Sequence, residues 1–137
     1  MARYALEDYN ISYGTESITG LAEEAFSISF NGKNTMTIGS KGEGSYNITS
    51  DNSATVTINL LQTSSSNAYL SGLLNIAKQN NGVASYPLVI NDSNGTTIYS
   101  CTDAVIESIP DTSRGRETGT NGWIILCTNL LGVEGGN

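Results

Sequence analysis

The segment from Thr55 to Leu60 reads TVTINL, and it decides the fold class. Its apolar residues alternate with polar ones, and a period of two is typical of a β-strand that buries one face. Similar short segments, bounded by Gly, Asn, Asp and Ser, recur along the chain, and this pattern predicts an antiparallel, mainly β domain. The further strands are expected at residues 9–13, 26–30, 35–38, 46–49, 86–90, 96–109 (with a break) and 123–128.

Glycine- and asparagine-rich segments mark the expected turns. Residues 31–34, NGKN, predict a hairpin that joins strands 26–30 and 35–38, and Asn94-Gly95 predicts a type I′ turn. Residues 39–44, GSKGEG, lack the residue order of a phosphate-binding loop and are interpreted as a turn. Residues 91–95, NDSNG, lack the pattern of a calcium loop, so no metal site is predicted.

One segment departs from the β pattern. Residues 64–66, three serines that could serve as N-caps, precede apolar residues at helical spacing, which predicts an amphipathic helix from Asn67 to Gln79. The apolar stripe is expected to pack on the outside of the sheet, and Leu73→Ala is expected to cost about 2–5 kcal/mol. The stripe consists of Tyr69, Leu70, Leu73, Leu74 and Ala77.

Composition excludes several function classes. A length of 137 residues suits one domain, and a net charge of −7 argues against a surface that grips nucleic acid through Lys and Arg. The absence of histidine removes histidine-based triads and the commonest metal ligand. Because no apolar run approaches a membrane span and no signal peptide begins the chain, we expect a soluble cytoplasmic protein that does not itself insert into a membrane.

The two cysteines, Cys101 and Cys127, have neither CxxC spacing nor a secretory context. We expect them to act as small buried apolar residues on strands, and a disulfide between them is the alternative. No cofactor is predicted.

Three neighbouring segments together resemble the central signature of a family of myophage structural proteins, which form the inner tube of contractile phage tails. These are GSKGEG at residues 39–44, TVTINL at 55–60 and LQTSSSNAYL at 61–70. Weaker similarities are the Asp92 to Gly95 turn, Pro110, Trp123 and the terminal Gly-Gly-Asn at 135–137. The resemblance extends over nearly the whole chain and is strongest from Gly39 to Leu74.

The resemblance implies two packed antiparallel β-sheets, a tail-tube β-sandwich or barrel, with one flanking α-helix. It also implies a single tail tube domain over residues 1–137, with the N-terminal segment and the tail at about 132–137 in contacts between subunits. Such proteins form hexameric rings that stack into a tube, with sheath, baseplate and terminator proteins as partners. The expected location is therefore the virion tail, assembled in the host cytoplasm.

Within such a tube, strand faces rich in Ser, Thr and Asn are expected to line a bore that passes double-stranded DNA without binding it tightly, or that only punctures a membrane in an R-type bacteriocin. Arg114 and Arg116 are candidates for contacts with carboxylates of an adjacent subunit, against a solvated loop. The polar faces also suit a monomeric sandwich, and two further alternatives stay open: a type VI secretion-like ring protein, and an uncharacterised carboxylate hydrolase.

Overall fold

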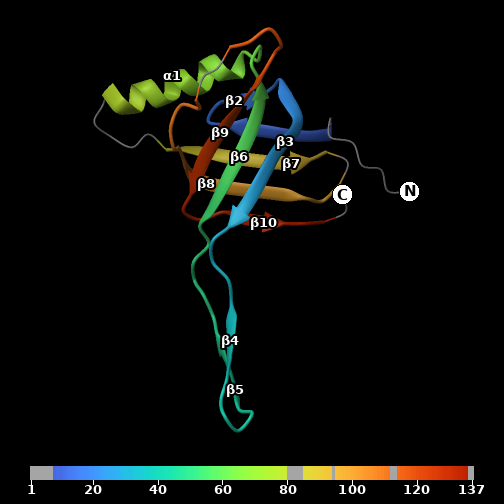
Figure 1. The fold of residues 1–137 in the computed structure, drawn as a ribbon, viewed down its shortest axis with the longest axis vertical. Coiled ribbons are helices and arrows are strands. Elements are labelled where there is room, and N and C mark those ends of the chain that lie inside the picture. Colours follow the sequence, from blue (N-terminus) through green and yellow to red (C-terminus); the bar gives the residue numbers. More distant parts are fainter. Residues whose placement is uncertain (1–7, 80–84, 94, 112–113, 136–137) are drawn as a thin grey trace.

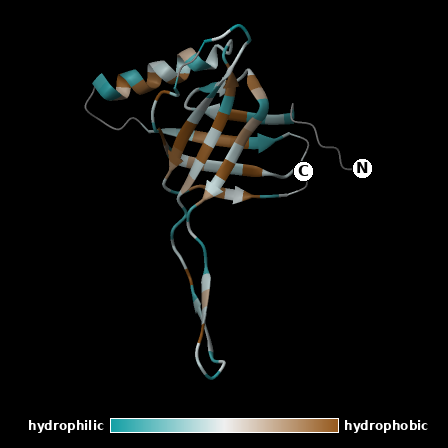
Figure 2. Ribbon diagram, viewed as in Figure 1, coloured by the Kyte–Doolittle hydropathy of each residue, from teal (hydrophilic) through white to brown (hydrophobic). Residues whose placement is uncertain are grey.

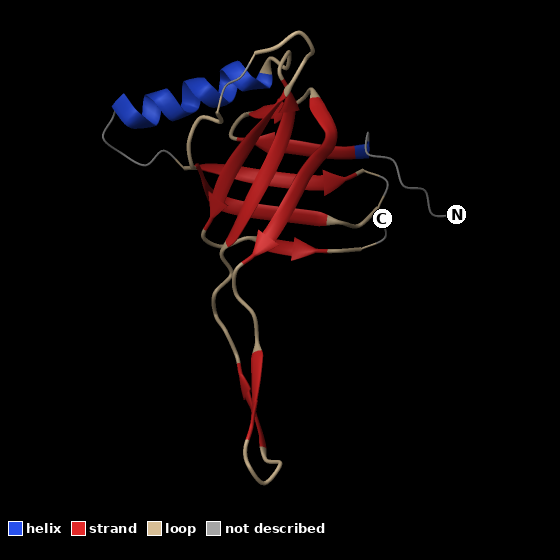
Figure 3. Cartoon of the chain, in the orientation of Figure 1, coloured by secondary structure: helices blue, strands red, loops and turns tan. Residues whose placement is uncertain are grey.

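The computed structural model describes residues 8–79, 85–93, 95–111 and 114–135, and it is mainly β, as predicted. This part of the chain contains ten strands and one helix (Figures 1 and 3). The strands are β1 (Tyr9–Tyr13), β2 (Glu16–Ile18), β3 (Leu21–Phe30), β4 (Thr35–Ile38), β5 (Gly44–Asn47), β6 (Ala54–Leu61), β7 (Tyr86–Asp92), β8 (Ile98–Ile106), β9 (Thr120–Cys127) and β10 (Leu131–Val133). The helix is α1 (Ser66–Gln79).

Eight strands form one antiparallel sheet that folds over into two layers. Its order is β2-β1-β7-β8-β9-β6-β3, and β10 pairs with β8 off this path. In Figure 1, β3, β6 and β9 cross in front of β1, β7, β8 and β10. Residues 104–106 of β8 pair with β9, while residues 98–100 pair with β10, so β8 and β9 join the two layers at one corner. We call this two-layered body the sandwich; its layers are halves of one sheet.

The alternation seen in the sequence fills the space between the layers. On β6, Val56, Ile58 and Leu60 are 0% exposed, whereas the polar residues between them lie on the half-buried outer face. Trp123 and Ile125 of β9 and Leu88 and Ile90 of β7 join the same core. Figure 2 shows apolar positions alternating with polar ones along these strands. Because each strand contributes one apolar face, two layers bury what a single sheet would leave in water.

The predicted hairpin between residues 26–30 and 35–38 is wrong. β3 pairs instead with β6, which places Phe26 opposite Ile58 and Ile28 opposite Val56. The physical reason is burial. The core covers the apolar side chains of β6, whereas Met36 and Ile38 stay exposed. Residues 35–38 form β4, which pairs with β5 in a separate two-stranded sheet.

The GSKGEG segment is a turn, as predicted. It joins β4 to β5, and Gly42 has a φ of 84°, a left-handed conformation that favours glycine. The link between β7 and β8 closes with a 3.1 Å bond from the Asp92 amide to the Thr97 carbonyl. The predicted type I′ turn there rests on Asn94, which lies outside the described residues.

Two short strands were missed because they are too short to show alternation. β2 pairs with β1, and β10 pairs with β8. The start of the tail, at Gly132 and Val133, therefore pairs with β8 of its own chain. β5 ends at Asn47 rather than residue 49, and β8 is shorter than residues 96–109.

The helix begins at Ser66 and ends at Gln79, one residue longer than predicted. It lies across the end of the sandwich drawn uppermost in Figure 1. Leu70 and Leu74 are buried in the core, and the other members of the predicted stripe, Tyr69, Leu73 and Ala77, are half-buried. Within the described residues, no helix has the length and apolar character that a membrane crossing requires.

Candidate assembly surfaces

A long arm projects from the sandwich between β3 and β6. We call residues 31–53 the arm; Figure 3 shows it as two strands joined by loops, extending away from the sandwich. Backbone and side-chain bonds from Asn31 to Ser53, at 3.1 and 3.0 Å, close its base. The pairing of β4 with β5 fixes its register, with Met36 opposite Tyr46 and Thr35 opposite Asn47.

The arm has two chemically different faces. Asn47 Nδ2 donates to Thr35 Oγ1 at 3.1 Å and to Thr37 Oγ1 at 3.0 Å, so one face is a hydrogen-bonded polar ladder. The other face is apolar and open: Met36 is 60% exposed, Ile38 55%, Tyr46 77% and Ile48 76%. A lone two-stranded hairpin is marginally stable in water, and exposed apolar patches of this kind mark interaction surfaces. The arm therefore has the chemistry of a segment that docks on another surface.

The front layer of the sandwich presents a second surface. Strands β6 and β9, and the part of β3 from Phe26 to Phe30, contain no charged residue. Register places small polar side chains side by side on the outer face of this layer, with Ser27 opposite Thr57 and Ser29 opposite Thr55. Ile124 and Leu126 of β9 complete the face beside Thr57 and Thr55. The face is uncharged and combines small polar side chains with Ile124 and Leu126.

The strand order leaves β3 and β2 as the end strands of the folded sheet. End strands offer backbone groups for pairing with another chain. Both strands are therefore available for contacts with another chain.

The two candidate arginines lie in the loop between β8 and β9. Both side chains are exposed, and Arg114 lines a small hollow together with Ala68 and Ser71 of α1 and Pro110. The loop stands at the helix end of the sandwich, away from the arm (Figure 1). The structure thus places the two arginines on one surface loop and does not bring them to the arm.

The family-like segment LQTSSSNAYL forms the junction between β6 and α1. Asn67 is its centre: its side-chain nitrogen donates to the carbonyls of Leu61, Gln62 and Ser64 at 2.9, 3.4 and 3.2 Å. Its side-chain oxygen accepts a 2.9 Å bond from the Trp123 indole. One amide thus ties the helix start to β9 and the loop after β6.

Two serines of the same junction hold the turn between β2 and β3. Ser64 Oγ donates to the Thr19 carbonyl at 2.5 Å, and Ser66 Oγ accepts from the Thr19 amide at 2.9 Å. Gly20, with a φ of 73°, leaves no room for a Cβ, which would meet the Ser64 side chain at 2.6 Å. The side chains of this motif therefore hold neighbouring elements together through hydrogen bonds and close packing.

Burial raises the pKa of some titratable groups in the sandwich. Cys101 and Cys127 are free and buried, as predicted, and burial together with neighbouring Cys101 raises the pKa of the Cys127 thiol to about 12. Burial also raises the pKa of Tyr13, whose hydroxyl donates to the Ala104 carbonyl at 2.8 Å. These groups serve the core.

Metal binding and hydrolysis by carboxylates each depend on several side chains that share one space. Among the described residues, no group of three His, Cys, Asp or Glu side chains could hold a metal ion. The hydrolase alternative needs two carboxylates that face one space. The cleft between the layers, described below, holds one carboxylate, Glu134, and Glu23 and Glu24 line an adjoining hollow.

Comparisons with known proteins agree with the geometry. A family model described as "Bacteriophage PhiTE tail tube protein" matches residues 8–133. The sequence comparison with curated proteins finds no match. Three solved structures share the fold at low identity, so they support the fold alone.

The first is the sheath/tube terminator of an extracellular contractile injection system (PVC) in its extended state, with a TM-score of 0.70, 15% identity, and coverage of 98% of this chain and 99% of that one. The second is the sheath-tube complex of such a system, with a TM-score of 0.60, 13% identity, and coverage of 96% of this chain and 91% of that one. The third comes from the virion of a native gene transfer agent particle, with a TM-score of 0.66, 14% identity, and coverage of 96% of this chain and 100% of that one.

Proposed function

Because the chain belongs to the bacteriophage PhiTE tail tube protein family, we propose that it is a non-enzymatic structural subunit that assembles into stacked hexameric rings. The rings form the inner tube of a contractile tail or tail-like particle. The arm is the observation that carries this proposal, since its apolar face is exposed and needs a partner. In a tube, that partner is another copy of the same chain.

The proposed tube gives each surface a role. The uncharged outer face of β6, β9 and residues 26–30 of β3 lines the bore, where small polar side chains stay wet without attracting phosphate. The arm connects copies, and Arg114 and Arg116, at the opposite end of the sandwich, approach carboxylates of a neighbouring subunit or ring. Sheath, baseplate and terminator proteins are the partners of the assembled tube, which lies in the virion tail.

A second candidate is a tube terminator, a subunit that forms one capping ring rather than a continuous tube. This candidate comes from the fold that the chain shares with the sheath/tube terminator, at a TM-score of 0.70; the sheath-tube complex shares the same fold at 0.60. The family model favours the tube. Both candidates predict rings, and they differ in whether rings stack.

Electron microscopy of the purified protein separates the candidates. We expect hollow tubes of stacked rings; isolated rings that do not elongate would favour the terminator, and monodisperse small particles under all conditions would contradict both. The matched variant removes residues 34–49 and joins Lys33 to Ser50. Since β3 pairs with β6 independently of the arm, this variant should stay folded and soluble, with unchanged melting, but form no tubes.

A further inference from the structure

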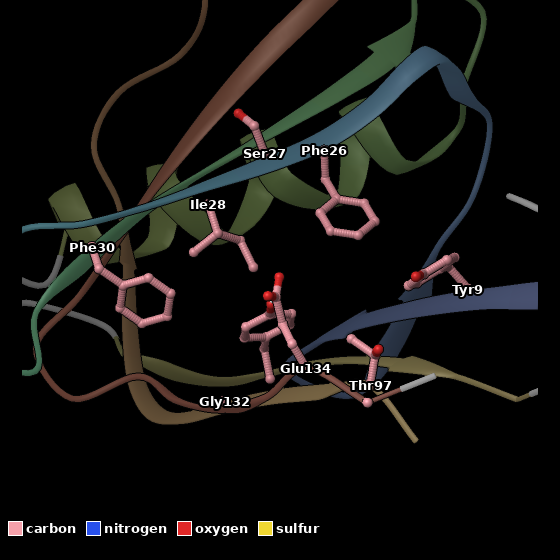
Figure 4. A pocket seen from close by; sticks show the side chains of 10 residues that line it. Tyr9, Phe26, Ser27, Ile28, Phe30, Thr97, Gly132 and Glu134 are labelled. Atoms are coloured by element: carbon pink, nitrogen blue, oxygen red, sulfur yellow. The ribbon is translucent and has the colours of Figure 1, made fainter. Parts of the chain in front are cut away.

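A cleft opens between the two layers of the sandwich on the side where β3 ends. It has a volume of about 730 Å³, its apolar lining consists of Tyr9, Phe26, Ile28, Phe30 and Tyr99, and Glu134 also lines it. Figure 4 shows Phe26, Ile28 and Phe30 pointing from β3 toward the opposite layer, while Ser27 points away.

The two ends of the sandwich differ in what covers them. At the helix end, Leu70 and Leu74 of α1 are buried in the core. At the cleft, Phe30 is 41% exposed, and Tyr9, Phe26 and Ile28 are only half-buried. The cleft combines these apolar side chains with polar ones such as Thr97 and Glu134. In the described part of the chain, no element covers its apolar side chains as α1 covers the core at the opposite end.

The walls of the cleft are well fixed. Tyr99 Oη donates to Glu134 Oε1 at 2.6 Å, which holds the start of the tail against β8. Burial, with the hydrogen bond and charge of Glu134, raises the pKa of Tyr99 to about 12, so this bond keeps its proton at neutral pH. The rings of Phe30 and Tyr99 lie 6.3 Å apart, and those of Tyr9 and Phe26 5.5 Å apart. The cleft is thus a preformed acceptor.

The arm matches this acceptor in chemistry but cannot reach it within one subunit. It leaves β3 immediately after Phe30 and extends away from the sandwich (Figure 1). Its open face carries Met36, Ile38, Tyr46 and Ile48, one row of apolar side chains of the kind that the cleft lacks. An arm that enters a cleft must therefore belong to a different copy.

Charge favours the same pairing. The cleft margin is acidic through Glu134, and Glu23 and Glu24 line an adjoining hollow that shares Tyr9 and Phe26. The chain carries −7 overall, but the arm is neutral, because Lys33 and Lys41 balance Glu43 and Asp51. The arm can therefore approach an acidic neighbour without the repulsion that two whole subunits meet.

We propose that the cleft of each subunit receives the arm of a second copy, with the row of Met36, Ile38, Tyr46 and Ile48 covering Phe26, Ile28 and Phe30. This inference rests on the proposed function, since it names the acceptor through which that assembly forms. Each subunit is then both donor and acceptor, and the heterologous contact repeats from copy to copy. Burial of the arm and filling of the cleft occur in the same step.

Cysteine cross-linking between differently substituted copies tests the pairing. One protein carries Tyr46→Cys and the other Phe30→Cys; they are mixed, assembled and treated with a short bis-maleimide. We expect covalent dimers in the mixture and few in either protein alone. The matched control replaces Phe30→Cys with Ile76→Cys, a position 50% exposed on α1, and should give no dimer.

The outcomes separate this inference from the proposed function. Tubes or rings without a dimer between positions 46 and 30 would overturn the cleft as acceptor and leave the tube assignment intact. Absence of any assembly would overturn both.

A second variant guards against a cysteine that disturbs packing. Phe30→Glu should keep the melting temperature of the isolated subunit near that of the wild type, because the side chain is partly exposed, and should prevent assembly. Ile76→Glu should assemble normally. Normal tubes from Phe30→Glu would contradict the proposal.

Discussion

The sandwich and the arm carry the same alternation of apolar and polar residues, but the two regions use it differently. In β6, Val56, Ile58 and Leu60 are fully buried against the opposite layer of the same chain. In the arm, the corresponding apolar row is 55–77% exposed. Alternation therefore predicts which face of a strand is apolar, and it leaves open whether the covering surface belongs to the same chain or to another copy.

The largest expected effect compares one substitution in both regions. Ile58→Ala should lower the free energy of unfolding of the isolated subunit by about 2–5 kcal/mol, because it leaves a cavity in the core. Ile48→Ala should change it by less than about 0.5 kcal/mol, because Ile48 is 76% exposed, and should weaken assembly instead. Denaturant unfolding measures the first quantity and electron microscopy the second. A substantial loss of subunit stability in Ile48→Ala would mean that the arm packs on its own sandwich.

A smaller contrast separates two asparagines whose side chains each bond to several partners. Asn67→Ala should cost about 1–3 kcal/mol, because the Trp123 indole and the carbonyls around the helix start lose a partner in a half-buried place. Asn47→Ala removes bonds to Thr35 and Thr37 on the arm, where water replaces them, and should cost less than about 0.5 kcal/mol. Thermal unfolding of both variants provides the comparison. Equal losses of stability would contradict the inference that Asn67 stabilises the junction between β6, α1 and β9.

Alkaline pH should affect the sandwich through its buried acids. The raised pKa values of Tyr99 and Cys127, both about 12, mean that the unfolded chain loses these protons first. Their stabilising contribution is complete below about pH 9 and is lost as the pH rises toward 12. Tyr99→Phe should therefore flatten the fall of the melting temperature above pH 10, with little change at pH 7. An unchanged alkaline slope would show that Tyr99 is not the responsible group.

The sequence allowed the sandwich to be predicted better than its connections. The strand at residues 55–60 and the stripe of α1 depend on local periodicity, which the structure confirms. β3 could pair with the strand after a nearby turn or with a distant apolar strand. The NGKN turn at residues 31–34 favoured the nearby strand, whereas β3 pairs with β6. Local turn chemistry does not reveal how much surface each pairing buries.

The candidate surfaces were harder to predict for a related reason. The cleft combines Tyr9, residues of β3 and Tyr99, which are separated by up to 90 positions and come together only through the fold. Part of the exposed face of the arm was visible as the alternation of residues 35–38, but the sequence predicted that this strand pairs with residues 26–30. Arg114 and Arg116 remain a prediction about contacts with a neighbour.

The smallest expected effect on stability concerns the polar faces of the two regions, one of which is proposed to line the bore. Thr57→Lys on the sandwich and Thr37→Lys on the arm both change polar side chains on strand surfaces, and each should alter subunit stability by less than about 0.5 kcal/mol. Their effects on DNA should differ, because a ring of lysines inside the tube neutralises phosphates of a duplex that enters it. Each added phosphate contact should steepen the dependence of log affinity on log salt by about 0.9. Duplex retained by sedimented tubes, measured across a salt series, should therefore rise for Thr57→Lys and stay near the wild-type value for Thr37→Lys. If only the Thr37 variant retained more DNA, the arm rather than the sandwich would line the bore. If the Thr57 variant retained no more DNA than the wild type, the front layer would not line the bore, even if the tube itself forms as proposed.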